Sequence, residues 1–534
     1  MGRKTLLLLS VVSGFLLSLP WIFPSSSSSM FIAFVPLLFV EDQITLKKQS
    51  QKSIVLFLYA LSSFFVWNVL STWWIANVSI SGMIIIAVIN AFLMALVWWM
   101  MHLVRRKFAA RAGYLSLVVF WLTFEFLHFN WSINWPWLTL GNGFASSVKL
   151  IQWYEFTGVL GGSLWVLLSN LLIFRFAKSI FRKEMPEAVK FGSLSIAIIL
   201  MPVCLSLFQY YNFKENGEVR EVVVLQPNID PFSEKFSGMS DEEQTHRLIS
   251  LAETIISHST DYVLAPETAL AQMWEDQEIS QNPVLQPVNS LIDKYPNVRF
   301  VVGVMTKKEI VAGEPVSSSA RQTDDGRSYN VFNSALMVDH SGKVQVGHKS
   351  LLVSGVEKMP FEKYFSFLRK YTVDLGGVSG SLAAANQLTV FDGSGQDKIG
   401  SVICFESAFG AHVGNAVANG ANLIFVMTND GWWKDSPGVR QHFSYSRLRA
   451  IETRRSVVRS ANTGISGFIN QKGDMVKKSG VNTSTAIISE MRINNTITFY
   501  VLYGDYLGRV SMFLSGLILI YLILYAKTKR PLNH

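Results

Sequence analysis

One cysteine of the sequence, Cys404, lies where a thiol can act as a nucleophile. It follows the apolar run Ile399–Ile403, which is typical of a β-strand, and precedes a helical pattern over Ala408–Asn419. A strand end exposes the side chain, and the dipole of a following helix lowers the pKa of a thiol at its N-terminus. We therefore expect Cys404 to be exposed, with a lowered pKa, as a nucleophile requires. The alternative is a small, inert residue packed at the end of the strand.

Two other segments place ionisable side chains beside apolar runs of the same kind. Glu267 follows the strand-like run Tyr262–Ala265, and Lys349 begins an apolar run with Glu357 eight residues further on. Taken singly, these would be a solvated charge at a strand end and a surface lysine. In α/β sheets, however, sites gather beyond the carboxyl ends of strands, so Glu267 and Cys404 can converge. Together they predict a thiol with acid–base groups beside it.

Other kinds of site have no counterpart in the sequence. There is no Gly-x-Ser-x-Gly motif, no His-Glu-x-x-His zinc helix, and no glycine-rich loop for phosphates or dinucleotides. Two cysteines among 534 residues exclude a disulfide framework and a cysteine-rich zinc site. We therefore expect neither a metal nor a cofactor.

The elements that must position these residues belong to a chain of unusual composition. Half of it is hydrophobic and 16% is charged, whereas soluble proteins carry about 25% charged residues. Long apolar stretches approach the ~20 residues that cross a hydrocarbon core. They are Thr5–Phe23, Ser53–Ile75, Ile80–Val104, Tyr114–Phe129, Thr157–Phe174, Phe191–Gln209 and Gly508–Ala526. The shorter run Met30–Val40, which contains Pro36, could be a tilted span, a re-entrant loop or half a hairpin.

Basic clusters fall on every second connection between these stretches, as expected for cytoplasmic loops. They include Arg3 and Lys4, Lys47 to Lys52, Arg105 to Arg111, Arg175 to Lys183, and Lys527 to Arg530. If Met30–Val40 crosses, seven crossings precede the long polar region and place it outside the cytoplasm. The net charge of +9 is then mainly topogenic, and no nucleic acid partner is expected. A cleaved signal peptide is the alternative for the N-terminus, but no small-x-small site precedes Pro24, which favours a retained helix.

The polar region has the composition of a soluble domain. Strands are predicted at Glu221–Leu225, Asp261–Leu264, Val298–Met305, Ala335–Asp339, Ile399–Ile403, Leu423–Met427, Ser456–Ser460 and Ile465–Asn470. Helices are predicted at Asp241–Ser257, Ala408–Asn419 and Gly438–Arg455, the first with a capping box of Ser240 and Glu243. Mixed strands and helices predict an α/β layered domain. We divide the chain into membrane helices over 1–211, a catalytic domain over 212–506, and a last membrane helix with a basic tail over 507–534.

Glu267, Lys349 and Cys404, with Glu406 shortly after the cysteine, resemble the Glu-Lys-Cys triad of the nitrilase superfamily. With the predicted spans around it, the chain resembles the apolipoprotein N-acyltransferase family, in which the domain lies between the seventh and eighth spans. Further motifs carry this resemblance along most of the chain. They are Pro136–Gly141, Gln226–Ile229, Thr428–Asp430, Gln441–His442, Arg449–Glu452 and Asn462–Ser466.

Three positions depart from the family pattern. The family usually has Pro-Phe-Gly before the glutamate that corresponds to Glu357, where this chain has Ser354–Val356. Phe405 stands where the family often has tyrosine, and Phe236 where it often has tryptophan. The charged groups are intact, so these departures bear on substrate preference and loop geometry.

The resemblance implies a fold, a reaction and a location. The fold is a polytopic α-helical membrane domain of eight spans plus a nitrilase-like α/β domain with αββα layers outside the cytoplasm. The reaction transfers a fatty acyl chain from a membrane phospholipid to the N-terminal α-amine of a diacylglyceryl-cysteine apolipoprotein. It proceeds through a thioester on Cys404 and needs no cofactor. The location is the bacterial inner membrane, in contact with its lipid bilayer, with a periplasmic domain. The sequence leaves the oligomeric state open, and we expect a monomer.

The resemblance also implies roles for single residues. Glu267 is the general base, and Lys349 stabilises the oxyanion together with a backbone N–H near Cys404. Glu357 and Glu406 orient these groups. Phe405 is a further supporting residue. Candidate walls or lids of the substrate site, with core packing as the alternative, are Trp432, Trp433, Phe236 and the amphipathic segment Phe361–Leu368.

Two other functions stay open at this point. The first is a membrane-anchored amidohydrolase of the same superfamily, in which water takes the acyl group. The multi-span membrane part favours the transferase, since an anchor needs one helix only. The second is a transporter or scaffold with an inactive domain. It is disfavoured because ionisable groups in the spans are scarce, Glu125 and His128 being the main exceptions.

Overall fold

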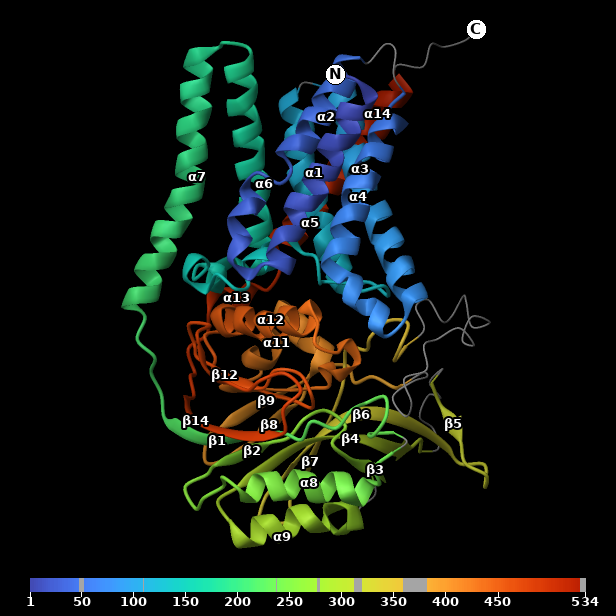
Figure 1. The fold of residues 1–534 in the computed structure, drawn as a ribbon, viewed down its shortest axis with the longest axis vertical. Helices are drawn as coiled ribbons and strands as arrows, with labels where there is room; N and C mark the ends of the chain where they lie inside the picture. The colour runs from blue at the N-terminus through green and yellow to red at the C-terminus, as the bar shows by residue number, and fades with distance from the viewer. Residues whose placement is uncertain are drawn as a thin grey trace. The chain divides into compact units, whose positions relative to one another are not determined.

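The computed structural model describes residues 1–47, 52–108, 110–236, 238–275, 279–311, 319–358 and 382–528. The chain forms two compact units (Figure 1). The helical unit comprises residues 1–131, 135–212 and the segment from residue 503 onward. The α/β unit comprises residues 132–134 and 213–502.

The helical unit consists of apolar helices, and eight of its described segments are long and apolar enough to cross a membrane. Each long apolar stretch predicted from the sequence coincides with one of them to within a few residues. The chain is therefore a multi-pass membrane protein. The helices are α1 (Arg3–Ile22), α2 (Val35–Leu46), α3 (Ile54–Thr72), α4 (Ile80–Lys107), α5 (Ala110–Asn130), α6 (Tyr154–Phe181), α7 (Met185–Asn212) and α14 (Tyr506–Thr528).

The short apolar run Met30–Val40 falls in a broken segment. A 3-10 helix, η1 (Pro24–Phe31), leads to α2, and Pro36 lies in the first turn of α2. Proline is tolerated there because its missing N–H has no partner in the helix in any case. Pro24–Leu46 as a whole counts among the eight candidate spans, so this segment is long and apolar enough to cross as two short helices.

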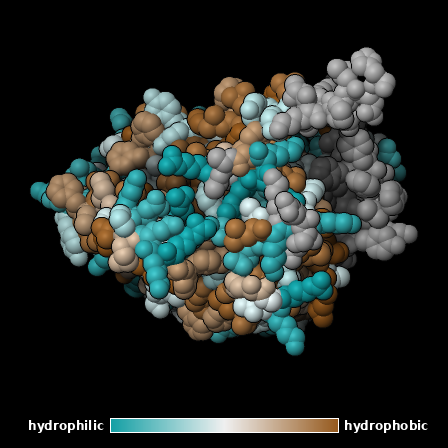
Figure 2. All heavy atoms as spheres, turned by 90° about the horizontal axis from the view of Figure 1, so that it is seen from above, coloured by the Kyte–Doolittle hydropathy of each residue, from teal (hydrophilic) through white to brown (hydrophobic). Residues whose placement is uncertain are grey.

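Hydrophilic side chains cover the middle of the face seen from above, with hydrophobic ones around its rim (Figure 2). In Figure 1 the N-terminus lies at this upper end of the helical unit. Basic residues stand at the C-terminal ends of alternate helices, at Lys47 after α2, Arg105–Lys107 in α4 and Arg182 after α6. Successive membrane helices alternate in direction, so these basic ends share one side of the membrane.

Buried ion pairs between charged side chains connect helices of this unit. Glu41 and Asp42 of α2 are buried and both pair with Arg105 of α4. Glu41 Oε1 lies 2.8 Å from His102 Nδ1, and Lys178 Nζ of α6 donates to Asp42 Oδ1 at 2.6 Å. Our expectation that Glu125 and His128 are the main ionisable residues in the spans was therefore wrong. The charges occur as opposite pairs, which is how buried charges are tolerated in an apolar medium.

The α/β unit contains two mixed β-sheets. One has the strand order β14-β1-β2-β4-β6-β5, with β3 on β4 and β7 on β6, and the other has the order β13-β12-β11-β10-β9-β8. The strands of the first sheet are β1 (Val219–Gln226), β2 (Tyr262–Leu264), β3 (Leu270–Trp274), β4 (Arg299–Glu309), β5 (Arg321–Gln322), β6 (Ser328–Val338), β7 (Val344–His348) and β14 (Thr485–Arg492). Those of the second are β8 (Val390–Asp392), β9 (Lys398–Ile403), β10 (Leu423–Thr428), β11 (Val457–Ala461), β12 (Gly467–Ile469) and β13 (Met475–Lys478).

Helices cover the outer face of each sheet. Along β1, Val223 and Leu225 pack against α8 (Asp241–Glu253) and α9 (Gln286–Lys294). Val222 and Val224 face the second sheet instead, because side chains alternate along a strand. The other face of the second sheet packs against α11 (Gly410–Ala418) and α12 (Pro437–Thr453). The predicted αββα order is confirmed (Figure 1).

Every strand and helix predicted for this unit is present, although several bounds differ. The capping box of Ser240 and Glu243 at α8 is also confirmed. The sequence analysis missed α9, the short helix α13 (Phe499–Tyr503) and six strands, β3, β5, β7, β8, β13 and β14. Several of these are very short or exposed, as β5 and β13 are along their whole length. Such strands lack the run of buried β-branched residues on which the prediction depended.

Strand directions bring the chemistry-bearing segments to one edge of the first sheet. β2 is parallel to β4, β6 is antiparallel to β4, and β7 is antiparallel to β6. β2 and β7 therefore run in the same direction and end at the same edge. Glu267 follows β2 and Lys349 follows β7, so the topology places both residues there.

Candidate active site

Glu267 is the carboxylate at the centre of the site. It is 6% exposed, so it is not the solvated strand-end charge that it would be if taken singly. Its Oε1 accepts from Asn333 Nδ2 at 2.8 Å and lies 3.3 Å from Lys349 Nζ, while its Oε2 accepts from the Asn429 N–H at 3.0 Å. The next residue, Thr268, has a positive φ of 49°. The carboxylate is thus held on both oxygens at a strained turn.

Gly303 on β4 lets this turn approach closely. A Cβ at Gly303 would lie 2.6 Å from both the Glu267 Cα and the Thr268 nitrogen, and these are backbone atoms that cannot rotate away. We expect Gly303→Ala to displace Glu267 and to slow the reaction that uses this carboxylate by about 10- to 100-fold, since small misplacements of reacting groups are that costly. The catalytic rate of the purified chain measures this effect.

Gly414→Ala is the matched control for that substitution. Gly414 lies on α11 of the same unit, and a Cβ there meets nothing within 4 Å. We expect this variant to keep the full rate. Equal rates in Gly303→Ala and Gly414→Ala would contradict the proposed packing of the turn.

Lys349 is enclosed by two carboxylates. It is 1% exposed, and its Nζ donates to Glu357 Oε1 at 2.8 Å and to Glu267 Oε1 at 3.3 Å. Asn333 Nδ2 also donates to Glu357 Oε1, at 3.1 Å, and the Val353 N–H donates to Glu357 Oε2 at 2.8 Å. Burial opposes the charged ammonium, but Glu357 and Glu267 outweigh it and hold the pKa of Lys349 above its ordinary value. Lys349 is therefore a fixed positive charge.

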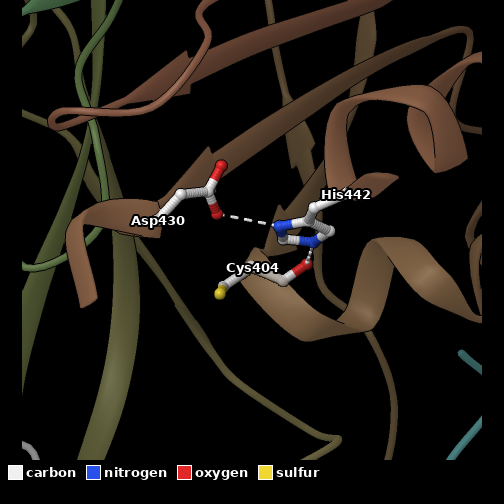
Figure 3. A group of neighbouring side chains, drawn as sticks. All are labelled: Cys404, Asp430 and His442. Atoms are coloured by element: carbon white, nitrogen blue, oxygen red, sulfur yellow. Dashed lines mark hydrogen bonds and ion pairs between the residues drawn. The ribbon is translucent and has the colours of Figure 1, made fainter. Parts of the chain in front are cut away.

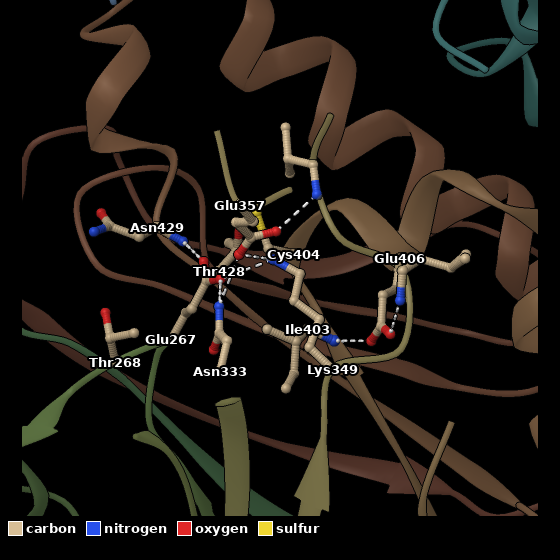
Figure 4. A network of polar contacts seen from close by, with 12 residues as sticks. Glu267, Thr268, Asn333, Lys349, Glu357, Ile403, Cys404, Glu406, Thr428 and Asn429 are labelled. Carbon is tan, nitrogen blue, oxygen red and sulfur yellow. Dashed lines mark hydrogen bonds and ion pairs between the residues drawn. The ribbon is translucent and has the colours of Figure 1, made fainter. Parts of the chain in front are cut away.

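Cys404 stands at the end of β9 and begins a short 3-10 helix, η8 (Cys404–Ala408). Its φ is +52°, in the left-handed region. Figure 4 places its sulfur beside the Lys349 ammonium and the carboxylates of Glu267 and Glu357. The structure therefore brings together the three residues predicted to be catalytic and the first of the predicted orienting residues.

The environment of the Cys404 thiol differs from our expectation. Burial raises its pKa, the Glu267 carboxylate acts in the same direction, and Lys349 opposes them without prevailing. The predicted exposed thiol with a lowered pKa was wrong for two reasons. The residue is only partly exposed, and the helix after it is one short 3-10 turn, with α11 beginning at Gly410. The resting thiol is neutral, so a base must take its proton during the attack.

Glu406 joins the two segments that carry the lysine and the cysteine. Its Oε1 accepts from the N–H groups of Ser350 and Leu351 at 2.7 and 3.1 Å, and its Oε2 accepts from the Ile403 N–H at 2.8 Å. Burial would raise its pKa, but His412 and these donors lower it to about 2. Glu406 is therefore an ionised carboxylate bound to the backbone of both segments, within the network of Figure 4.

The α/β unit matches the carbon–nitrogen hydrolase family over residues 222–499, which are 278 of the 534 residues. The chain belongs to this family. Residues 13–172 match the N-terminal domain of apolipoprotein N-acyltransferases. The family resemblance inferred from the motifs is confirmed.

Relatives of known name match the chain over most of its length. It is 26% identical to the apolipoprotein N-acyltransferase of Chlorobaculum tepidum, over 84% of each chain. It is 27% identical to that of Geobacter metallireducens, over 93% of this chain and 91% of the relative. Among solved structures, it is similar to Saccharomyces cerevisiae Nit3, a member of branch 10 of the nitrilase superfamily. That similarity has 14% identity and a TM-score of 0.37, and it covers 52% of this chain and 91% of Nit3.

The aromatic residues predicted to bind substrate fall into two groups. Phe236 stacks on Trp432 with ring centroids 5.7 Å apart, and the exposed Phe232 packs edge-on against the same tryptophan at 5.3 Å. These rings form an aromatic group at the surface of the α/β unit. Trp433 instead contacts the ring of the buried His442 at 5.4 Å, which is a packing contact. The predicted segment Phe361–Leu368 lies outside the described residues.

Phe405, predicted to support the site, packs into the core of the unit. It is 6% exposed, and its ring lies 5.0 Å from that of Phe409. Its side chain therefore contributes packing next to the nucleophile.

The sequence analysis missed two residues that hold the segment of Glu267 in place. Asn333 of β6 donates to both Glu267 and Glu357, and only the topology of the sheet reveals it. Lys235 is buried, and its Nζ donates to the Glu267 carbonyl at 3.1 Å and to Thr268 Oγ1 at 2.8 Å. Burial lowers the pKa of Lys235 to about 8. The sequence could have pointed to Lys235 through its position next to Phe236, a residue that the family pattern had already singled out.

Cys404, Asp430 and His442 form the group of described residues whose spacing suits a metal ion. Their ligand atoms lie within 4.8 Å of one another. Asp430 Oδ2 is paired with Arg459 Nη2 at 2.7 Å, and Asp430 Oδ1 lies 2.8 Å from His442 Nδ1. The carboxylate is thus neutralised and hydrogen-bonded within the protein, which explains the cluster without a metal.

The arrangement suits attack by a thiol on a carbonyl carbon. Glu267 can accept the proton of Cys404, and the charged Lys349 can stabilise the negative oxygen that forms. Both groups are preorganised by buried hydrogen bonds, and such preorganisation is the main source of electrostatic catalysis.

Proposed function

We propose that this protein transfers a fatty acyl chain from a membrane phospholipid to the free α-amine of a diacylglyceryl-cysteine apolipoprotein. The observation that carries this proposal is the group formed by the buried Glu267 and Lys349 with Cys404 in a carbon–nitrogen hydrolase unit, on a chain with eight candidate spans. The names of the relatives support the same reaction.

The first half-reaction forms an acyl-enzyme. Glu267 removes the proton from the Cys404 thiol, and the sulfur attacks the ester carbonyl of the phospholipid. Lys349 stabilises the tetrahedral oxyanion together with a backbone N–H, a contribution of about 3 kcal/mol per donor in other enzymes. The C–O bond then breaks, the lysophospholipid leaves with the proton from Glu267, and a thioester remains on Cys404.

The second half-reaction forms an amide. An α-amine has a pKa of about 7.7 to 8.0, so a useful fraction is uncharged near neutral pH. The amine attacks the thioester, the C–S bond breaks, and the amine proton passes through Glu267 to the departing sulfur. The enzyme returns to its resting state, and no cofactor is needed in either step.

The membrane side of the α/β unit is also part of the proposal. Basic residues cluster at the ends of alternate helices, as they do on the cytoplasmic side of membrane proteins. Seven candidate spans precede the α/β unit, which favours the opposite, periplasmic side of a bacterial inner membrane. We expect the chain to act as a monomer that draws both lipid substrates from the bilayer.

The test compares product formation with and without an amine acceptor. The purified chain is supplied with phospholipid, with or without a diacylated lipopeptide that bears a free N-terminus, and the products are identified by mass spectrometry. We expect lipoamide and lysophospholipid with the acceptor, and an acyl adduct on Cys404 without it. The rival amidohydrolase would release free fatty acid at the same rate in both samples, and that result would refute the transferase.

A further inference from the structure

The Cys404–Phe405 peptide unit is held in one orientation by side chains outside the catalytic group. Cys404 has a φ of +52°, a conformation that a residue other than glycine keeps only where its surroundings impose it. Its carbonyl oxygen accepts from Ser407 Oγ at 2.7 Å and lies 3.2 Å from His442 Nε2 (Figure 3). Two polar side chains thus hold one side of this peptide unit.

The ring of His442 is held in place through its other nitrogen, Nδ1. It is fully buried on α12, and its Nδ1 lies 2.8 Å from Asp430 Oδ1 and 2.9 Å from Arg459 Nη2. Arg459 Nη2 also donates to Asp430 Oδ2 at 2.7 Å. Burial opposes ionisation of Asp430, but Arg459 and His442 hold the pKa of this carboxyl well below its usual range. Asp430 is therefore a buried, ionised support for the imidazole ring.

The neighbours of His442 Nε2 favour a proton on this nitrogen. This nitrogen faces the Cys404 carbonyl at 3.2 Å and Ser407 Oγ at 3.0 Å, and Ser407 already donates to that carbonyl. A ring protonated on Nδ1 alone would set a lone pair of Nε2 against the lone pairs of the carbonyl oxygen. With a proton on Nε2, alone or together with one on Nδ1, His442 donates to Cys404.

The orientation of the carbonyl decides where the next N–H points. A trans peptide bond is planar, so its N–H points away from its C=O. The Phe405 N–H therefore points to the side of the peptide opposite His442 and Ser407. It is also among the first N–H groups of η8, which have no partner within the helix. Among the described residues it has no competing acceptor, so it can donate to a negative oxygen that forms next to the sulfur.

We propose that His442, supported by Asp430 and Arg459, is a positioning residue that aims the Phe405 N–H at the oxyanion as the second donor beside Lys349. This inference rests on the proposed function, because an oxyanion forms only if Cys404 attacks a carbonyl carbon. The His442 ring contacts the nucleophile at its backbone carbonyl. It acts through the backbone of the nucleophile.

The test compares two reactions of the same thiol in full-length protein in detergent. Alkylation of Cys404 by iodoacetamide forms no oxyanion, whereas acylation by a p-nitrophenyl fatty ester or by phospholipid does. We expect His442→Ala to lower the acylation rate about 100-fold, the usual effect of losing one oxyanion donor. We expect the same variant to change alkylation by less than about threefold, because proton removal by Glu267 is intact.

A conservative variant and a milder one complete the design. His442→Gln keeps an N–H donor and is expected to recover most of the acylation rate. Ser407→Ala removes the other donor to the Cys404 carbonyl with little change in volume, and we expect it to lower acylation about tenfold and to spare alkylation. If His442→Ala does not fold, Ser407→Ala tests whether the orientation of the Cys404–Phe405 peptide matters for acylation.

The outcomes separate this inference from the proposed function. A fall in acylation alone supports the positioning role. A parallel fall in both reactions, or no fall in either, overturns it, since a merely structural residue affects both. If the wild-type chain is acylated by the p-nitrophenyl ester but never by phospholipid, the proposed function fails, while the comparison of variants still tests the orientation of Phe405.

Discussion

Cys404→Ser is expected to abolish acyl transfer, by at least about 10⁴-fold, the order of loss seen when a catalytic nucleophile is removed. The hydroxyl has nearly the volume of the thiol, so the buried network around Glu267 and Lys349 should persist. A serine hydroxyl is a much weaker acid than a thiol. Glu267 is therefore too weak a base to remove the proton of a serine at this position. The measurement is the rate of lipoamide formation, together with intact mass for an acyl adduct.

Cys204→Ser is the matched control for the nucleophile. Cys204 is exposed on α7 and is remote in sequence from every proposed catalytic residue. We expect this variant to keep the wild-type rate and to form the same adduct on Cys404. Full activity in Cys404→Ser, or an acyl adduct on Cys204, would end the proposed mechanism.

Lys349→Met is expected to have the second-largest effect, on both activity and stability. It removes a donor to the oxyanion, which alone costs about 10²- to 10³-fold in rate. It also leaves Glu267 and Glu357 facing each other without a cation, and breaking a buried ion pair in this way costs about 3 to 5 kcal/mol of stability. We expect no measurable acyl-enzyme and a lower midpoint of thermal unfolding.

A double variant separates these two roles of the lysine. Lys349→Met combined with Glu357→Gln removes one of the two negative charges that would otherwise repel each other, so the midpoint of thermal unfolding should partly recover. The acylation rate should stay at the level of the single variant, because no charged donor has been restored. Recovery of activity in the double variant would mean that Lys349 only neutralises charge and takes no part in the reaction.

The reaction type and the membrane architecture were predictable from the sequence. Bilayer thickness sets the length of the apolar stretches, and membrane topology sets the placement of Lys and Arg. Both features can be read from short segments of the sequence. Glu267 and Cys404 stood out because each follows an apolar run, Lys349 stood out because it begins one, and the resemblance to the family joined the three. The α/β layers followed from strands with continuous buried faces, such as β1 and β10, whereas the αββα order came from the resemblance to the family.

The rest depended on contacts between segments distant in the sequence. The rise in the pKa of Cys404 comes from burial and from Glu267, neither of which can be read from the residues around the cysteine. Asn333 and Lys235 bind Glu267 across 66 and 32 positions of the chain. His442 reaches the Cys404 carbonyl across 38 positions. No local periodicity encodes such pairs.

The sequence by itself therefore determined which groups can do chemistry and on which kind of scaffold they stand. Side-chain type and local hydrophobicity are properties of single residues and short segments. The tertiary structure decided how acidic the thiol is, which carboxylate is held by which donor, and in which direction the peptide after Cys404 points. These depend on burial and on distances of a few ångströms between elements, and only the packed fold sets them.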